Sequence, residues 1–157
     1  MAGRAVARPG TCAAVLAFVS APLLGSPPDV TAKIASVSLQ PGGRGTVVVE
    51  MTMGRGWHVN SHAPLEEFLV PTVVALATST GQRLPVTYPA GEARSFAFSE
   101  KPLSVYAGTV RFEAELTLPP GVRSPVALPG EISFQACSDE QCFAPARVPL
   151  AAKVTIH

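Results

Sequence analysis

The sequence predicts an all-β fold, an immunoglobulin-like antiparallel β-sandwich. Short runs that alternate apolar and polar residues, or that are rich in β-branched residues, recur along the chain between turn signals. The 16 prolines and 13 glycines punctuate these runs at intervals that suit short strands. No segment shows the sustained 3.6-residue apolar period of a helix packed on a core. Together these observations favour a sandwich of short strands.

The length and composition narrow the function classes. With 157 residues, the chain is long enough for one domain with its own core and too short for two domains of usual size. The 12 Lys and Arg residues nearly balance the 11 Asp and Glu residues, so no basic field is present and nucleic acid is not expected as a partner. No Ser-His-Asp arrangement, phosphate-binding glycine loop or paired carboxylates stand out, and we expect no cofactor.

The first 26 residues are predicted to be a signal peptide. Arg4 and Arg8 supply a positive amino-terminal region, and the stretch 11–24 supplies the apolar region. This stretch is short for a bilayer span, and an uncleaved amino-terminal anchor is the alternative. Cleavage near Ser26 would leave a domain of residues 27–157 and remove Cys12, so that two cysteines remain. With either a cleaved signal peptide or an uncleaved anchor, the domain is expected to be exported.

The first half of this domain contains three predicted strands. Residues 32–39 alternate apolar and polar side chains, and residues 46–53 form a second β-rich run after the turn at 41–43. Residues 57–62 alternate again, and Pro64 ends that strand. Its two faces carry Trp57, Val59 and Ser61 on one side and His58, Asn60 and His62 on the other.

The middle of the chain is predicted to hold two further strands and a loop. The valine-rich run 69–77 and the short run 84–88 are separated by the turn 78–82. Residues 91–102 are the least regular part of the domain, and we expect them to form a loop. This loop displays two aromatic side chains, Phe96 and Phe98, among polar residues.

The last part of the chain is predicted to be all strand. Residues 106–118 alternate without a break, which indicates one long strand. A brief strand is expected at 126–128, and another at 131–136 leads to a pair of cysteines. The final strand is expected at 146–156.

Cys137 and Cys142 are the only cysteines outside the amino-terminal segment, and four polar or charged residues separate them. This spacing indicates a hairpin tip where the two Cα atoms lie within the ~4.4–6.8 Å that a disulfide requires. Closing so small a loop contributes only about 2–3 kcal/mol or less. A structural bridge and a redox-active pair, which is more typical of exposed or strained disulfides, both remain open on spacing alone.

The motifs around these cysteines resemble a known family. Gly56-Trp57-His58, Val105-Tyr106-Ala107-Gly108, Phe134-Gln135-Ala136-Cys137 and Cys142-Phe143-Ala144-Pro145 are similar to the amino-terminal periplasmic domain of the thiol:disulfide interchange protein DsbD. The resemblance implies an immunoglobulin-like periplasmic domain whose cysteine pair takes electrons from a membrane-embedded thiol donor. It passes them to thioredoxin-like periplasmic proteins, as a protein-disulfide reductase in disulfide isomerisation or cytochrome c maturation.

The same resemblance assigns the residues around the pair. In this family a mobile cap loop covers the cysteines with an aromatic side chain, a position that Phe98 matches, with Phe96 and Ser99 beside it. Family members carry acidic residues directly before that aromatic and tyrosines facing the cysteines, and this chain departs from both patterns. It offers His58 and Asn60 in place of the tyrosines, and Phe143 follows the second cysteine.

Exchange needs one cysteine that attacks and one that resolves the mixed disulfide. By resemblance, Cys142 attacks and Cys137 resolves. A protonated His58 facing the pair would lower a cysteine pKa, and the alternative is a histidine on a solvated strand face.

Two other function classes remain. His58, His62, Cys137 and Cys142 are residue types that bind zinc or copper. However, His58 and His62 would lie ~13 Å apart along an extended strand, and no metal is expected. The third class is an exported interaction module with a structural disulfide that binds a partner through its loops.

Overall fold

The computed structural model describes residues 28–155 except 41 and 123, so the predicted signal peptide and residues 156–157 lie outside the described residues. The described part contains no helix, and hence none of the length and hydropathy that a membrane span requires. Its strands are β1 (Val30–Leu39), β2 (Arg44–Met53), β3 (His58–Asn60), β4 (Val73–Leu76), β5 (Val86–Thr87), β6 (Glu92–Arg94), β7 (Leu103–Ala107), β8 (Thr109–Thr117), β9 (Val126–Phe134), β10 (Ala136–Cys137) and β11 (Ala146–Val154).

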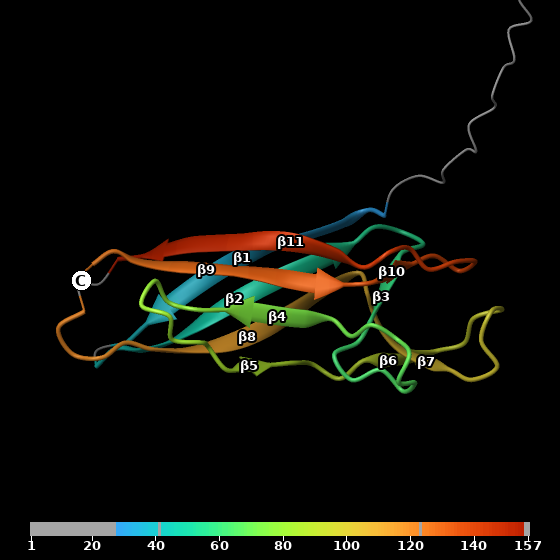
Figure 1. Cartoon of the computed structure of the whole chain (residues 1–157), viewed down its shortest axis with the longest axis horizontal. Helices are drawn as coiled ribbons and strands as arrows, with labels where there is room; N and C mark the ends of the chain where they lie inside the picture. Colours follow the sequence, from blue (N-terminus) through green and yellow to red (C-terminus); the bar gives the residue numbers. More distant parts are fainter. Residues whose placement is uncertain (1–27, 41, 123, 156–157) are drawn as a thin grey trace, which may run out of the picture.

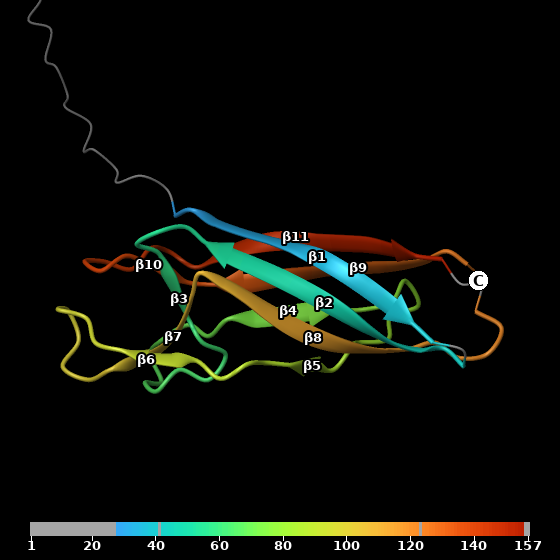
Figure 2. The same ribbon diagram turned by 180° about the vertical axis from the view of Figure 1, so that it is seen from behind.

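Two larger sheets form the layers of a sandwich. One has the strand order β1-β2-β8-β5 and the other the order β11-β9-β4, and the neighbouring strands in each are antiparallel. Figures 1 and 2 show these layers from opposite sides. A small sheet of order β10-β3-β7-β6 lies at one end of the sandwich (Figure 1). The predicted all-β, immunoglobulin-like antiparallel sandwich is confirmed.

The core lies between the two layers because the strands alternate in burial. On β2 and β8 every second side chain is buried, while the residues between them are mostly exposed or half-buried. Side chains with at most 1% exposure include Val47, Val49, Met51, Phe112, Leu116, Leu128 and Ile132. Phe112 meets the edges of Tyr88 and Tyr106, each with ring centroids 5.6 Å away. These contacts join the core to the small sheet, since Tyr106 lies on β7.

The predicted single strand 106–118 is wrong in one respect that matters for the site. Gly108 has a φ of +65°, and it divides the run into β7 and β8. β7 pairs with β3 in the small sheet, whereas β8 pairs with β2 in the larger one. Alternation continues across the break, so the sequence pattern does not reveal it. Gly108 therefore lets one run of sequence serve two sheets.

Other predicted boundaries also differ. Residues 126–128 and 131–134 belong to one strand, β9, which continues through Pro129, and the Pro129 carbonyl accepts a hydrogen bond from the Ala77 amide (3.1 Å). Residues 92–94 of the expected loop form β6, which pairs with β7. The runs 57–62, 69–77 and 84–88 contain shorter strands than expected, because loop segments take up their ends.

We predict that Gly108→Ala lowers the free energy of unfolding by about 1–2 kcal/mol, because an L-residue in the left-handed region carries this penalty. A Cβ at this position would meet no atom within 4 Å, so steric overlap does not contribute. Gly108→Asn is the matched control, since asparagine tolerates this region better, and its loss should be smaller. Urea unfolding of both variants checks the prediction, which an alanine variant as stable as the wild type would contradict.

Candidate active site

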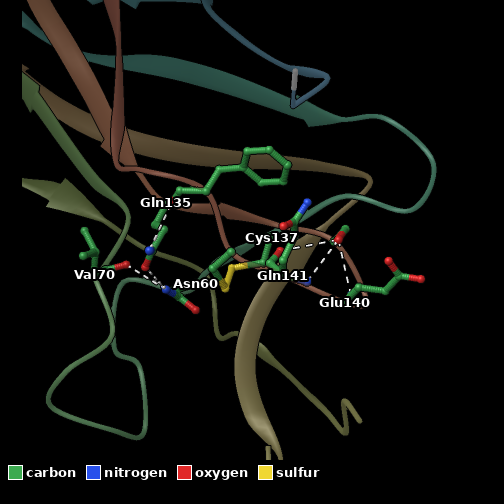
Figure 3. The surroundings of a disulfide bond; sticks show 9 residues. Asn60, Val70, Gln135, Cys137, Glu140 and Gln141 are labelled. Atoms are coloured by element: carbon green, nitrogen blue, oxygen red, sulfur yellow. Dashed lines mark hydrogen bonds between the residues drawn. A yellow bond between two sulfur atoms is a disulfide. The ribbon is translucent and has the colours of Figure 1, made fainter. Parts of the chain in front are cut away.

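The cysteine pair forms a disulfide at a tight turn. The Cα atoms of Cys137 and Cys142 are 4.0 Å apart, slightly closer than the expected range. Ser138 organises the residues between them, because its amide donates to the Gln141 carbonyl (2.8 Å) and its Oγ accepts from the amides of Glu140 and Gln141 (3.3 Å each). Figure 3 shows this turn beside the sulfur atoms. The hairpin tip predicted from the spacing is thus present.

The position of Cys137 follows from a change of sheet. β9 pairs with β11 up to Phe134, and from Ala136, two residues later, the chain pairs with β3 instead, which places Cys137 opposite His58. Cys137 consequently lies at the edge of the small sheet and is only 1% exposed. Cys142 forms an isolated bridge with Cys137 on the outer side of β10, and it is exposed. The two sulfur-bearing residues therefore differ sharply in access to solvent.

β3 is buried on both faces. On one face Val59 is fully buried in the core, together with Tyr106 and Ala136, its partners on the two neighbouring strands. On the other face His58 is 2% exposed. The alternative that His58 lies on a solvated strand face is wrong, because another segment covers that face.

The segment that covers His58 is the hairpin between β6 and β7. The Phe96 ring stacks on the His58 ring with centroids 4.2 Å apart and planes inclined by 18°. Burial lowers the pKa of His58; nearby Asp139 opposes this shift, whereas Arg94 adds to it. His58 is therefore held largely neutral near pH 7.

The two phenylalanines of this hairpin occupy different positions. Phe96 is half-buried on His58, whereas Phe98 is 44% exposed and stacks on the outer side of Phe96 (5.3 Å, 15°). The Ser99 amide donates to the Phe96 carbonyl (3.1 Å) and Ser99 Oγ to the Lys101 carbonyl (2.7 Å), which folds the hairpin tip. The resemblance implies that Phe98 covers the cysteine pair, and that remains a prediction; in the structure, Phe96 stacks on His58, the residue opposite Cys137. The two rings are two residues apart, a spacing that puts side chains on the same face of an extended segment.

A chain of amide groups ties β3 to the residue after Cys142. Asn60 is fully buried, and its Nδ2 donates to the Val70 carbonyl (3.1 Å) and to Gln135 Oε1 (3.5 Å). Gln135 Nε2 in turn donates to the Phe143 carbonyl (3.0 Å). Figure 3 shows Asn60, Val70 and Gln135 grouped next to the disulfide. Sequence reasoning missed Gln135, although it is a polar residue at the end of a buried strand directly before the pair.

Phe143 and His62 have other neighbours. The Phe143 ring meets the edge of Trp57, with centroids 5.2 Å apart, so it anchors the chain after Cys142. His62 lies beyond the end of β3, is exposed, and stacks on Tyr88 at 3.5 Å. Among residues 28–155, gaps excepted, no three His, Cys, Asp or Glu side chains gather where they could hold a metal ion.

Comparison with known proteins gives a consistent result. Residues 27–150 match the family described as thiol:disulfide interchange protein DsbD, N-terminal. The structure is similar to the N-terminal periplasmic domain of ScsB from Proteus mirabilis, with a TM-score of 0.52 and 21% identity over 78% of this chain and 43% of that chain. It is also similar to the reduced N-terminal domain of DsbD from Neisseria meningitidis, with a TM-score of 0.48 and 15% identity over 76% of this chain and 82% of that chain.

The chain thus spans less than half of the ScsB chain that it matches. No match was found among curated proteins. At sequence identities of 21% and 15%, the structural similarity shows the fold alone.

The buried His58 leads to a prediction about stability and pH. Its folded-state pKa is lowered, so the unfolded chain binds the proton first as pH falls below the ordinary histidine value of about 6.5. The stability that His58 contributes is therefore complete above that value and is lost as pH falls toward the folded-state pKa. We expect the free energy of unfolding to decrease less between pH 7 and pH 5 in His58→Gln than in the wild type.

Urea unfolding across this pH range measures the effect. His62→Gln, which makes the same replacement at an exposed histidine, is measured alongside as the control. Equal slopes for His58→Gln and the wild type would show that burial does not govern this histidine.

Proposed function

The chain belongs to the family of the amino-terminal domain of the thiol:disulfide interchange protein DsbD, and on this premise we propose that it relays reducing equivalents through Cys137 and Cys142. The single observation that carries the proposal is the unequal exposure of the pair. Cys142 is exposed whereas Cys137 is 1% exposed. A partner protein can approach only one of the two sulfur atoms, and this supports Cys142 as the exchanging cysteine and Cys137 as the resolving one.

The chemistry follows from this arrangement. Reduction of the domain begins when a donor thiolate attacks Cys142 Sγ and forms a mixed disulfide. The electron pair of the broken Cys137–Cys142 bond leaves on Cys137 Sγ. The second thiol of the donor then releases Cys142. Delivery to a client protein is the reverse sequence, in which Cys142 attacks and Cys137 resolves. Each complete exchange, from donor to domain or from domain to client, transfers two electrons and two protons.

The position of the disulfide also supports an exchangeable bond. The cysteines are five residues apart, so the closed loop is small and contributes little to the stability of the fold. The core cluster is built from other side chains. Opening the bond therefore leaves the sandwich intact.

We place this activity outside the cytoplasm. The proposal includes a signal peptide at residues 1–26, a domain at 27–157 and a periplasmic location, which is also the location of the ScsB domain. The proposed electron donor is a membrane-embedded thiol protein, and the proposed clients are thioredoxin-like proteins of disulfide isomerisation or cytochrome c maturation. The domain would then act as a protein-disulfide reductase.

An interaction module with an inert disulfide is the second candidate. It is favoured by Phe68 and Leu65, which are 80% and 64% exposed on the segment between β3 and β4. Glu66 of that segment pairs with Lys101 of the β6–β7 hairpin (3.3 Å), so the loop that carries these apolar side chains contacts the hairpin. The reduction potential separates the two candidates, because inert structural disulfides have potentials below about −300 mV.

We predict that a reduced thioredoxin-like protein opens the Cys137–Cys142 bond, and that the mixed disulfide forms at Cys142. Cys137→Ser should form a mixed disulfide with the oxidised form of such a protein, because the Cys142 thiolate attacks the partner's disulfide, whereas Cys142→Ser, whose remaining cysteine is buried, should react far more slowly. Alkylation followed by mass spectrometry of tryptic peptides identifies the bonded cysteine. A potential below about −300 mV, or a bond that stays closed, would favour the interaction module.

A second prediction concerns the aromatic cover. Phe96→Ala should speed reduction of the disulfide by dithiothreitol more than Phe98→Ala, because Phe96 stacks on His58 and Phe98 only on Phe96. Phe98→Ala should change the thermal midpoint little, since that ring is 44% exposed. Leu65→Ala, an exposed residue outside the hairpin, serves as the control. Unchanged rates in both phenylalanine variants would argue against a protective cover.

A further inference from the structure

Two buried atoms of β3 have no hydrogen-bond partner in the described part of the chain: His58 Nε2 and Asn60 Oδ1. Buried polar groups are usually paired, and an unpaired one costs free energy. Asn60 is already engaged through its Nδ2 with Val70 and Gln135. His58 is different, because its unpaired atom belongs to a group that can take up and release a proton.

The register of the small sheet places His58 beside Cys137. Ala107 on β7, His58 on β3 and Cys137 on β10 occupy one row across three strands. Side chains directly opposite each other on antiparallel strands lie on the same face, with Cβ atoms roughly 4.5–5.5 Å apart. The stacked Phe96 ring covers the imidazole and excludes water from it. The unpaired nitrogen is thus enclosed in the immediate surroundings of the buried cysteine.

We propose that His58 is the general base for Cys137, taking its proton through Nε2 when this cysteine resolves a mixed disulfide at Cys142. The inference rests on the proposed function and adds the proton path to it. A disulfide has no hydrogen to share, whereas the reduced Cys137 has an S–H donor. The missing partner of Nε2 therefore exists only in the reduced state.

Cys137 needs such a base because of its burial. The thiolate is the nucleophile in exchange, and a thiol enclosed in apolar surroundings ionises less readily than one in water. Cys142 is exposed and can lose its proton to solvent. With its ring hydrogen on Nδ1, a neutral His58 presents a free lone pair on Nε2.

The charged groups around His58 set the pH range of this role. Burial lowers the pKa of His58 and keeps its ring in the basic form near neutral pH. Asp139, in the turn between the cysteines, opposes this shift, and Arg94 on β6 reinforces it while paired with Glu92 (2.9 Å).

Closure of the Cys137–Cys142 bond conserves electrons and protons. After Cys142 has attacked a client disulfide, it is joined to one client sulfur. Cys137 then gives its proton to His58 Nε2, and its electron pair forms the Cys137–Cys142 bond. The Cys142–client bond breaks, its electron pair leaves on the client sulfur, and that sulfur takes a proton from solvent. His58 returns its proton to solvent, so the client gains two electrons and two protons and the pair is oxidised.

Oxidation of the reduced protein by glutathione disulfide separates formation of the adduct at Cys142 from closure of the disulfide by Cys137. Acid quenching and mass spectrometry resolve the reduced protein, the glutathione adduct and the closed disulfide over pH 5–9. In His58→Gln we expect the adduct to form as in the wild type and to close about 100-fold more slowly at pH 7, the lower end of what a positioned base contributes. The difference should shrink toward pH 9, above the ordinary thiol pKa of about 8.5, because a growing fraction of Cys137 then ionises without a base.

His62→Gln is the matched control and should close at the wild-type rate, since His62 lies outside the row. Equal closure rates and equal pH profiles in His58→Gln and the wild type would overturn the assignment, as would an equal delay in His62→Gln. NMR titration of the wild-type protein tests it without a substitution. The His58 pKa should differ between the disulfide and dithiol forms; an unchanged His58 pKa contradicts the proposal.

The outcome for the proposed function remains separate. A His58-dependent closure with glutathione disulfide, but no exchange with thioredoxin-like proteins, would support the base and refute the relay. Exchange with thioredoxin-like proteins at rates independent of His58 would support the relay and refute the base.

Discussion

The pairing of β10 with β3 is the interaction on which the candidate site depends. The two strands share only the pairs Ala136–Val59 and Cys137–His58, yet these pairs take the chain out of the β9–β11 ladder. The same pairing puts Ala136 into the core and turns Cys137 toward the opposite face. The anchoring of the redox pair is therefore part of the sandwich itself.

Burial on both faces gives β3 two distinct environments. The face toward the sandwich is closed by Val59 and Tyr106, and it belongs to a core whose disruption would unfold the domain. The other face is closed by the β6–β7 hairpin through stacked rings and by the exposed Lys101–Glu66 pair, which contributes at most about 1 kcal/mol. The contacts that close this face are therefore weaker than the core contacts on the other face.

The amide chain from Asn60 through Gln135 to Phe143 complements this arrangement. It holds the segment after Cys142 by hydrogen bonds that do not involve the sulfur atoms. The edge contact between Phe143 and Trp57 adds an apolar anchor to the same segment. These supports lie on either side of the turn and hold both cysteines through contacts other than the disulfide. A pair held in this way has little conformational entropy to lose when the bond closes.

The all-β class and the turn that joins the cysteines can be predicted from the sequence. Both depend on local pattern: the period of two along each strand, the proline and glycine punctuation, and the five-residue spacing of Cys137 and Cys142. Three features needed the tertiary contacts: Gly108 divides a run between two sheets, β10 joins β3, and the Phe96 ring stacks on His58. Alternation assigns side chains to two faces of a strand, but it does not state which distant segment packs on either face. For β3 that segment is a hairpin more than thirty residues away, and its contact turns a histidine on a polar face into a buried neighbour of the cysteine pair.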